Sequence, residues 1–576
     1  MDKEGFVREL TADRIDEFPE SGRVGPLSIS DVQRCILHAI HSCYRVHFGV
    51  DIIKLPGHGS SVMKRAPVVS SYEEKHLLTL IPTHDHETID TLYKNWKRTY
   101  FSSPVDQIRD YFGEGVSLYF SFSSLYTRFL IIIALLGITE FLSEKYLGMD
   151  HVYSSVGFTL LNIFGLALYL EVWKRTSNEQ SYFWGTTGKL RNKIPRPEYR
   201  GDLRMSPISG KEEMYYSPSK TMKKVLMVSA PLTLLCLSIA LMLMFASLYV
   251  EAELIVYLTD PETGEIYPDI FSSVLSNIPS ITYSLLIILF NSIYLKIARK
   301  LTIWENHRTQ EQHDTHVTAK LVVFEFVNTF IALFYTGFYL QDLKSLKSQL
   351  FTTLMVQQAV NQVQEVLIPF FLHKPSSVRL MSKVSAKLGI KQKIIERNVK
   401  NIEELSSEDP RIQPVLQDIG ADHLDSLHDD FMELWLQFGH VFLFSAVYPL
   451  AAVLALSNNI TELWADRYKM CRLTRKPRPV SVRDIGAWYT AFKLIGMLSV
   501  LTNCCLLSLD LKSRTEVSWF SSDLSWFLFW VLVEHILLCI FLGLDTLISD
   551  VPRHVKMEQD RTEHHFKQLS IKQKQE

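Results

Sequence analysis

The chain has 576 residues, of which 47% are hydrophobic and 12% aromatic, and its formal net charge is -2. This apolar composition argues against a string of ordinary soluble domains and indicates that much of the mass lies in lipid. The near-neutral charge gives no reason to expect a nucleic-acid partner. Seven cysteines without paired spacing indicate neither a disulfide framework nor a zinc site.

Residues 1–115 mix helical and strand patterns, which predicts a small α+β cap in the cytosol. Residues 30–46 have the spacing of an amphipathic helix, 76–82 that of a strand and 87–101 that of another helix. His84 and His86 have the spacing of a metal pair. A loop that starts a helix, with Asp85 near the cap, is the favoured interpretation.

Ten apolar stretches follow, each near the roughly 20 residues that a helix needs to cross a bilayer. They lie at about 124–146, 154–173, 225–250, 271–295, 319–340, 349–371, 431–447, 449–465, 485–508 and 524–547. We therefore predict an all-α polytopic membrane protein whose residues 116–551 form a ten-helix transmembrane domain. Because the first span begins so late, we expect no cleaved signal peptide.

The loops between the spans differ in charge. Residues 176–224 are rich in Lys and Arg, whereas residues 257–270 carry four acids and no base. Basic loops tend to stay in the cytosol, so with ten spans we expect both termini to be cytosolic. Residues 374–427 are predicted to be a second cytosolic segment and 552–576 a cytosolic tail. The chain has no phosphate-binding glycine loop and no nucleophile elbow, so we predict that it is not an enzyme.

Acids gather at the ends of three predicted spans. Residues 429–466 predict a helical hairpin that turns near Pro449, which returns the acids of its two ends to a similar depth. Together with the end of the sixth span, the hairpin offers three pairs spaced i, i+3 or i, i+4, so that each pair shares one helix face. The six residues are Asn361, Glu365, Asp430, Glu433, Glu462 and Asp466.

Five carboxylates brought together repel one another by about 2 kcal/mol per pair at roughly 8 Å and an effective dielectric near 20. We expect Arg467 and Lys469 to face the membrane interface, and the sixth and seventh spans have no central base. Two calcium ions would compensate the charge, since an all-oxygen set suits calcium better than zinc, and magnesium keeps more of its own water. The alternative is that these acids only cap or snorkel at membrane edges.

A stripe of polar residues runs along the fourth, fifth and sixth spans. The residues are Ser273, Asn277, Ser280, Ser284, Asn291, Glu325, Asn328, Tyr335, Tyr339, Thr353 and Gln357. Small polar residues often only join helices. Polar faces on three consecutive helices favour instead a hydrophilic furrow, and the scarcity of bases along it favours lipid headgroups over chloride.

Several stretches in order resemble the anoctamin family of calcium-activated channels and scramblases, over about residues 104–555. They are "IRDYFGEGVSLYFSF", "LEVWKR", "LTIWENHRT" and "LQFGHVFLFSAVYPLAAVLALSNN". The compact loops, "FGEGVSLYF" and "GAWYTAF" most resemble the endoplasmic-reticulum branch that includes anoctamin ten. The cap is shorter at its start than in relatives, and the sixth span lacks the hinge glycine of channel members.

The resemblance implies ten transmembrane helices, a homodimer joined through the last span, and a furrow in each subunit formed by spans three to seven. The family's two-calcium site falls on the same six residues that the spacing selects. A further calcium site, between the second and tenth spans, falls on Glu171, Asp545 and Asp550.

These features together predict a calcium-activated phospholipid scramblase that moves lipids passively between leaflets, in the endoplasmic reticulum membrane. One alternative is a calcium-activated chloride channel, which shares the calcium site and differs in what crosses. The second alternative is a structural tether between membranes, which has no use for costly buried acids.

Overall fold

The computed structural model describes residues 27–41, 52–54, 61–63, 82–99, 102–147, 151–187, 196, 199–205, 207, 210, 212–259, 270–363, 427–509 and 522–575. The chain divides into two compact units. The first holds the described residues of Met1–Ser121, Asn361–Leu427 and Thr461–Val482, and the second those of Phe122–Val360, His428–Ile460 and Arg483–Glu576. Helices α5 (Glu114–Leu142) and α16 (Ala451–Tyr468) each begin in one unit and end in the other.

The first unit is built on short helices around an aromatic core. Its elements are α1 (Ile29–His41), the antiparallel strands β1 (Ile52–Lys54) and β2 (Ser61–Met63), α3 (His86–Lys97), α4 (Val105–Phe112) and the π-helical turn η8 (Lys469–Leu473). Helix α4 packs against α1 and α3, and α3 packs against η8. Trp96, Tyr111 and Phe112 are each no more than 2% exposed and form the centre of this core.

The helix predicted at 30–46 is confirmed by α1 as far as His41, and the one at 87–101 by α3 as far as Lys97. Asp85 is the N-cap residue of α3. The predicted strand at 76–82 lies outside the described residues apart from its last residue, and so does the predicted segment 374–427. Gly113 separates α4 from α5 with a φ of 98°, a left-handed value that glycine adopts without strain.

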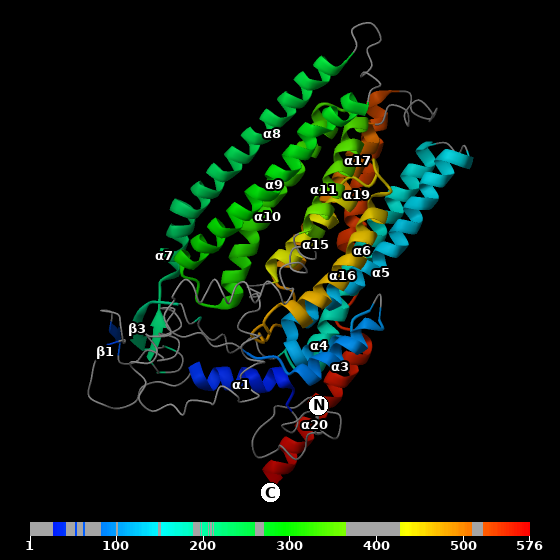
Figure 1. The fold of residues 1–576 in the computed structure, drawn as a ribbon. Helices are drawn as coiled ribbons and strands as arrows, with labels where there is room; N and C mark the ends of the chain where they lie inside the picture. The colour runs from blue at the N-terminus through cyan, green and yellow to red at the C-terminus, as the bar shows by residue number, and fades with distance from the viewer. Residues whose placement is uncertain are drawn as a thin grey trace. The chain divides into compact units, whose positions relative to one another are not determined.

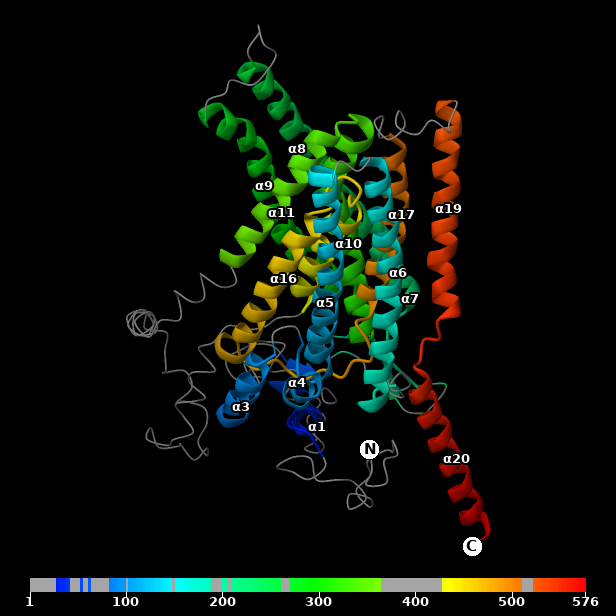
Figure 2. The same cartoon turned by 90° about the vertical axis from the view of Figure 1, so that its right-hand side faces the viewer.

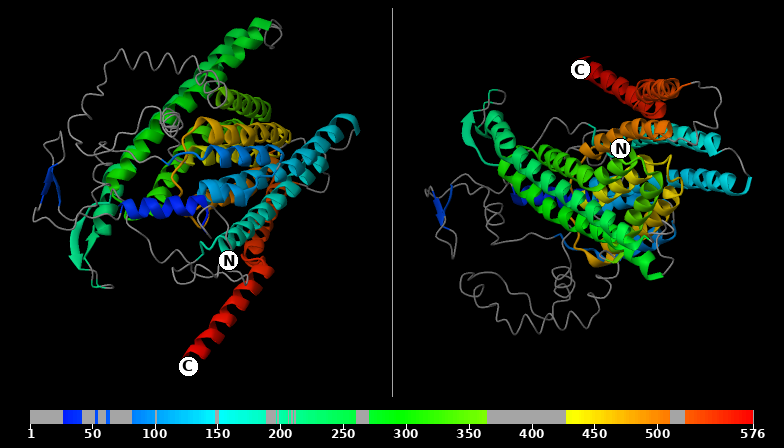
Figure 3. Two further views of the ribbon diagram at one scale, coloured as in Figure 1. Left: turned by 60° about the horizontal axis from the view of Figure 1, so that its bottom comes forward. Right: turned by 90° about the horizontal axis from the view of Figure 1, so that it is seen from above.

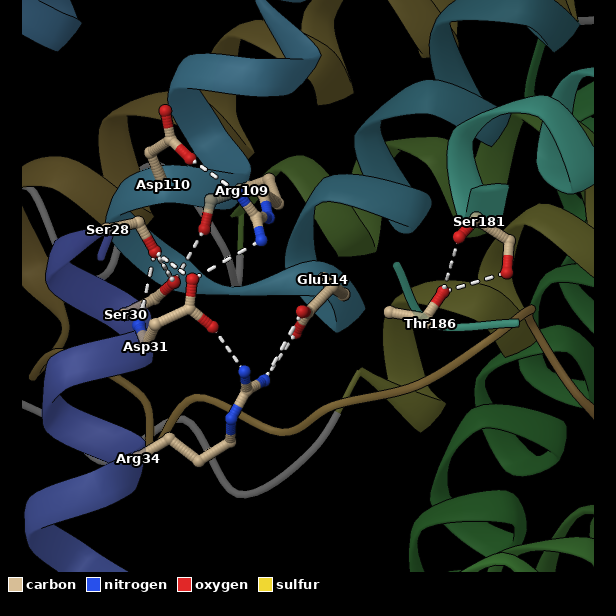
Figure 4. Close-up of polar contacts among 9 residues, drawn as sticks. All are labelled: Ser28, Ser30, Asp31, Arg34, Arg109, Asp110, Glu114, Ser181 and Thr186. Carbon is tan, nitrogen blue, oxygen red and sulfur yellow. Dashed lines mark hydrogen bonds and ion pairs between the residues drawn. The ribbon is translucent and has the colours of Figure 1, made fainter. Parts of the chain in front are cut away.

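A network of charged side chains ties α1 to α4 and to the first residue of α5 (Figure 4). Arg34 on α1 forms ion pairs with Asp31 and with Glu114, whose carboxylate is 3.1 Å away. Arg109 on α4 reaches Asp31 at 3.3 Å and Asp110 at 2.9 Å. Because Glu114 is almost fully buried, its pairing with Arg34 offsets the cost of placing a carboxylate inside the unit.

The second unit contains most of the long helices. They are α6 (His151–Phe183), α8 (Ala230–Leu258), α9 (Ile270–Glu305), α10 (Gln310–Phe334), α11 (Leu343–Gln362), α15 (His428–Phe442), α17 (Ala487–Leu509) and α19 (Asp523–Leu547), although the last two residues of α11 belong to the first unit. Shorter elements are η2 (Ser143–Leu147), the antiparallel strands β3 (Asp202–Met205) and β4 (Glu212–Tyr215), α7 (Pro218–Lys224), η4 (Val225–Ser229) and η5 (Tyr335–Tyr339), and α20 (Arg553–Gln575) follows the last long helix.

Neighbouring helices of this unit pack in two groups. Helices α8, α9 and α10 lie side by side (Figures 1 and 3). Helix α17 packs against α6, α10, α15 and α19. Figure 2 shows α17 beside α6. The ring centroid of Phe122 lies 5.0 Å from that of Trp173 and 4.7 Å from that of Phe492. The centre of the second group is therefore an aromatic cluster.

Seven helices among the described residues are long and apolar enough to cross a membrane. They lie at Glu114–Leu142, Ser154–Phe183, Pro218–Leu258, Ile281–Glu305, Gln310–Tyr339, Ala487–Leu509 and Leu524–Leu547. The other three predicted spans correspond to α11, whose described part ends at residue 363, to α15, with 15 residues, and to α16, with 18. Helix α15 is shorter than the seven, and the polar and acidic side chains of α16 lower its mean hydropathy, so the count of ten stays a prediction.

Candidate functional site

The C-terminal half of α16 buries two of the predicted calcium ligands in the first unit. Glu462 is 4% exposed and Asp466 is 2% exposed. Gln362 Nε2 donates to Glu462 Oε2 at 3.4 Å, and the hydroxyl of Tyr119 donates to Asp466 Oδ2. The i, i+4 spacing therefore places both carboxylates on one buried face of the helix, as predicted from the sequence.

Basic side chains near these acids differ from the expectation that they face the membrane interface. Arg467 is only 7% exposed, and its Nη1 donates to the carbonyl oxygen of Trp96 at 2.9 Å. Lys469 Nζ lies 3.8 Å from Asp466 Oδ1. The Trp96 carbonyl oxygen also accepts from the backbone N–H and the hydroxyl of Thr99, at 3.1 and 2.9 Å. The Arg467 guanidinium adds a positive charge at this C-terminal, negative end of α3.

The other predicted ligands lie on α15 and α11. Asp430, in the second unit, is 6% exposed, and Glu433 one turn later is half-buried. The preceding residue, Asp429, forms an ion pair with Arg299 at 3.2 Å. Asn361 lies in the last turn of α11, while its side chain and the whole of Glu365 are outside the described residues.

The second predicted set, on α6 and at the end of α19, is held together by lysines. Glu171 is 4% exposed, and its Oε2 has no hydrogen-bond partner. Lys174 Nζ lies 2.9 Å from Asp545 and 2.6 Å from Asp550, and Lys493 Nζ lies 2.8 Å from Asp545. Two ammonium groups thus balance most of the charge of three carboxylates, so this set needs a metal less than the first.

Polar residues of the predicted stripe form a hydrogen-bond network between α9 and α10. The Asn291 amide donates to the Glu325 carboxylate, and the Asn328 amide donates to the Asn291 carbonyl oxygen. Glu325 and Asn328 are each 4% exposed. The network joins the two helices, which is a common role of polar side chains in membranes.

Other residues of the stripe divide into three groups. Ser284 is 2% exposed, whereas Tyr339 is 74% exposed and stacks on Tyr335 with ring centroids 4.9 Å apart. Gln357 on α11 is half-buried. The side chains of the three stripe residues nearest the start of α9 lie outside the described residues; they are Ser273, Asn277 and Ser280.

A cavity of about 30 Å³ opens among α8, α9, α10 and α11 in the second unit. Thr353 of the predicted stripe lines it. Its other polar lining residues are Ser247, Glu251, Tyr283, Thr329 and Gln349. Ser247 and Glu251 were not predicted because α8 is apolar almost throughout; their i, i+4 spacing within it is the pattern that could have found them.

A family model described as "Anoctamin: Calcium-activated chloride channel" matches residues 108–562. The chain belongs to the anoctamin family. This anoctamin is 35% identical to Anoctamin-10 of Homo sapiens over 509 residues, which cover 87% of the chain and 72% of that relative. Anoctamin-8 of Homo sapiens is 31% identical over 54% of the chain and 25% of its own length.

A third relative, Anoctamin-7 of Homo sapiens, is 26% identical over 74% of the chain and 52% of its own length. The predicted family and its anoctamin-ten branch are therefore confirmed. Family membership and the seven apolar helices make this anoctamin a multi-pass integral membrane protein.

Proposed function

We propose that this anoctamin is a calcium-activated phospholipid scramblase that moves lipids passively between the two leaflets. The observation that carries the proposal is the burial of Asp430, Glu462 and Asp466, each no more than 6% exposed, near the ends of helices in a membrane protein. Ionisable groups placed there are costly, and they are retained where they bind an ion or a substrate. A purely structural tether gains nothing from them.

Calcium is the ion that fits these side chains. The donor atoms are carboxylate and amide oxygens, which calcium prefers, and no Cys or His belongs to the proposed set. Asn361, Glu365, Asp430, Glu433, Glu462 and Asp466 would hold two ions. When bound, calcium supplies four positive charges against five negative ones; without it, the repulsion between the carboxylates pushes the end of the sixth span away from the α15–α16 hairpin.

Movement of the sixth span would affect the transport path because one helix, α11, contributes residues to the proposed calcium site and to the cavity. Its end carries Asn361 and its middle carries Thr353, which lines the cavity among α8 to α11. Drawing the end of α11 inward therefore biases the helices around the cavity toward an open state. Lipid headgroups would then pass along the polar side chains while the acyl tails stay in lipid.

The charge of the cavity favours lipid over chloride as the transported species. Among the described residues that line it, one is an acid, Glu251, and none is Lys, Arg or His. A pore for anions is expected to carry positive charge at such a constriction, whereas a zwitterionic headgroup is compatible with hydroxyl, amide and carboxylate groups. The matching family model is nevertheless described as a calcium-activated chloride channel, so chloride conduction is the second candidate function.

The calcium step can be tested with Asp466→Asn and Glu462→Gln in full-length protein reconstituted into liposomes. We expect the calcium concentration for half-maximal lipid scrambling to rise severalfold or more, because each change removes a ligand charge. Asp484→Asn is the matched control, since Asp484 is exposed and lies outside the set. If both ligand variants scramble with wild-type calcium sensitivity, the site is assigned wrongly.

Two further proposals rest on the resemblance to the family: a homodimer joined through α19 and residence in the endoplasmic reticulum membrane. A third, cytosolic termini, rests on the basic loop at residues 176–224 and on the count of ten spans. The second acidic set, with Glu171, Asp545 and Asp550, is proposed to bind a third calcium ion in competition with Lys174.

A further inference from the structure

The turn between α9 and α10 brings together one carboxylate and two imidazoles. Helix α9 ends at Glu305, and Asn306 has a φ of 65°, a left-handed conformation that asparagine tolerates better than most residues. Asn306 is fixed there by hydrogen bonds to both backbone groups of Arg200. This reversal directs His307 back toward Glu305.

Helix α10 then begins with a capping box, in which the Thr309 hydroxyl accepts from the Gln312 backbone N–H. The box sets the start of the helix so that His316, in its second turn, stacks on His307 with ring centroids 4.1 Å apart. One ligand atom from each of Glu305, His307 and His316 lies within 4.8 Å of the others.

One oxygen at this place lacks a hydrogen bond. Glu305 is fully buried, with His307 Nε2 at 2.8 Å and Lys320 Nζ at 2.9 Å from its Oε2. Its other oxygen, Oε1, has no hydrogen-bond partner, although the equally buried hydroxyl of Ser229 lies beside the carboxyl group. A cation bound beside this buried carboxylate would supply a direct partner for its Oε1.

We propose that Glu305, His307 and His316 bind a zinc ion. Two imidazoles and one carboxylate are a common zinc ligand set, whereas calcium and magnesium prefer oxygen alone. Ligand atoms around tetrahedral zinc stand about 3.3 Å apart, so the three side chains would move closer on binding. The stacked rings of His307 and His316 would also turn, so that one nitrogen of each points at the ion. The zinc would replace the proton between His307 and Glu305, with Ser229 or water in the fourth position.

The zinc site is separate from the proposed calcium site and does not depend on it. The cysteine pattern predicted no zinc site, and this one uses no cysteine. Lys320 is the cation that balances Glu305 in the absence of metal, so it competes with zinc. A bound ion would fix the turn that joins α9 to α10, two of the helices that line the cavity.

The test measures zinc on the full-length protein, purified without a histidine tag, stripped with a chelator and re-exposed to zinc in excess calcium. Elemental analysis is expected to find one zinc per chain fewer in His316→Gln than in wild type. His564→Gln, which alters an exposed histidine on α20, is expected to match wild type. Equal zinc content in the wild-type and His316→Gln proteins would overturn the proposal.

A second variant guards against misfolding of the first. Lys320→Gln removes the competing ammonium group and leaves all three ligands in place, so zinc affinity is expected to rise at least severalfold. Competition against cobalt, followed by the visible absorption of tetrahedral cobalt, gives this affinity. An unchanged or weaker affinity in Lys320→Gln contradicts the proposal, because an ion-pair network without a metal site predicts no gain.

Discussion

Replacing Lys174 with methionine tests whether a lysine occupies the place of calcium in the second acidic set. Lys174 Nζ lies 2.9 Å from Asp545 and 2.6 Å from Asp550, and Lys493 also pairs with Asp545. With Glu171, the three carboxylates and two ammonium groups leave a single negative charge. Lys174→Met raises this to two negative charges, which match one calcium ion.

The size of the effect follows from Coulomb's law. An ammonium group and a calcium ion roughly 5 Å apart repel by about 7 kcal/mol at an effective dielectric near 20. The side chains of Lys174, Asp545 and Asp550 are 23%, 25% and 54% exposed, so water and salt screen most of this repulsion. We expect about 1.4 kcal/mol to remain, which corresponds to a tenfold gain in calcium affinity.

Thermal unfolding in detergent, with and without calcium, measures the change. Without calcium, Lys174→Met is expected to unfold at a lower temperature than wild type, because like charges lose a counter-ion. Calcium should then raise its midpoint by more than it raises the wild-type midpoint. Arg175→Met is the control, since the Arg175 guanidinium contacts a backbone carbonyl oxygen, that of Ser549, at 3.2 Å. Equal calcium responses in the wild-type and Lys174→Met proteins would refute the competition.

Two further predictions concern stability. A Cβ at Gly439 would lie 2.3 Å from the Phe330 ring, so Gly439→Ala is expected to lower the free energy of unfolding by about 1–3 kcal/mol, despite the better helix propensity of alanine. The control is Gly543→Ala, which has open space around it and should not lower the unfolding midpoint. Burial lowers the pKa of the Lys476 ammonium, which lies over the Tyr111 ring, to about 8. The folded protein then releases a proton that the unfolded chain keeps up to about pH 10.5, so the free energy of unfolding should rise with pH between about 8 and 10.5. Melting curves recorded at several pH values test this, because Lys476→Met should remove the rise.

Patterns within one helix were the part of the fold that could be predicted. The amphipathic spacing of α1 and α3 and the long apolar runs of α6, α8 and α17 need no information from distant residues. The same holds for the placement of Glu462 and Asp466 on one face of α16, which follows from their i, i+4 spacing. Contacts between distant segments were not predictable: the guanidinium of Arg467 reaches Trp96, which lies 371 residues away in sequence.

The proposed zinc ligands could also not be predicted to meet from the sequence alone. The stretch "ENHRTQEQHDTH" places Glu305, His307 and His316 within twelve residues, which is a visible pattern of possible ligands. Whether they meet depends on the left-handed Asn306 and on the start of α10 after Thr309. Spacing alone does not fix a turn of this kind, so only the structure brings the three side chains together.

The central claim is tested most directly by reconstituting the purified full-length protein into liposomes that contain fluorescent phospholipids, with and without calcium, while chloride efflux is recorded from the same vesicles. The account predicts that calcium accelerates the movement of labelled lipid between leaflets. Chloride efflux without lipid movement would contradict it in favour of a channel, and the absence of both would favour a structural role.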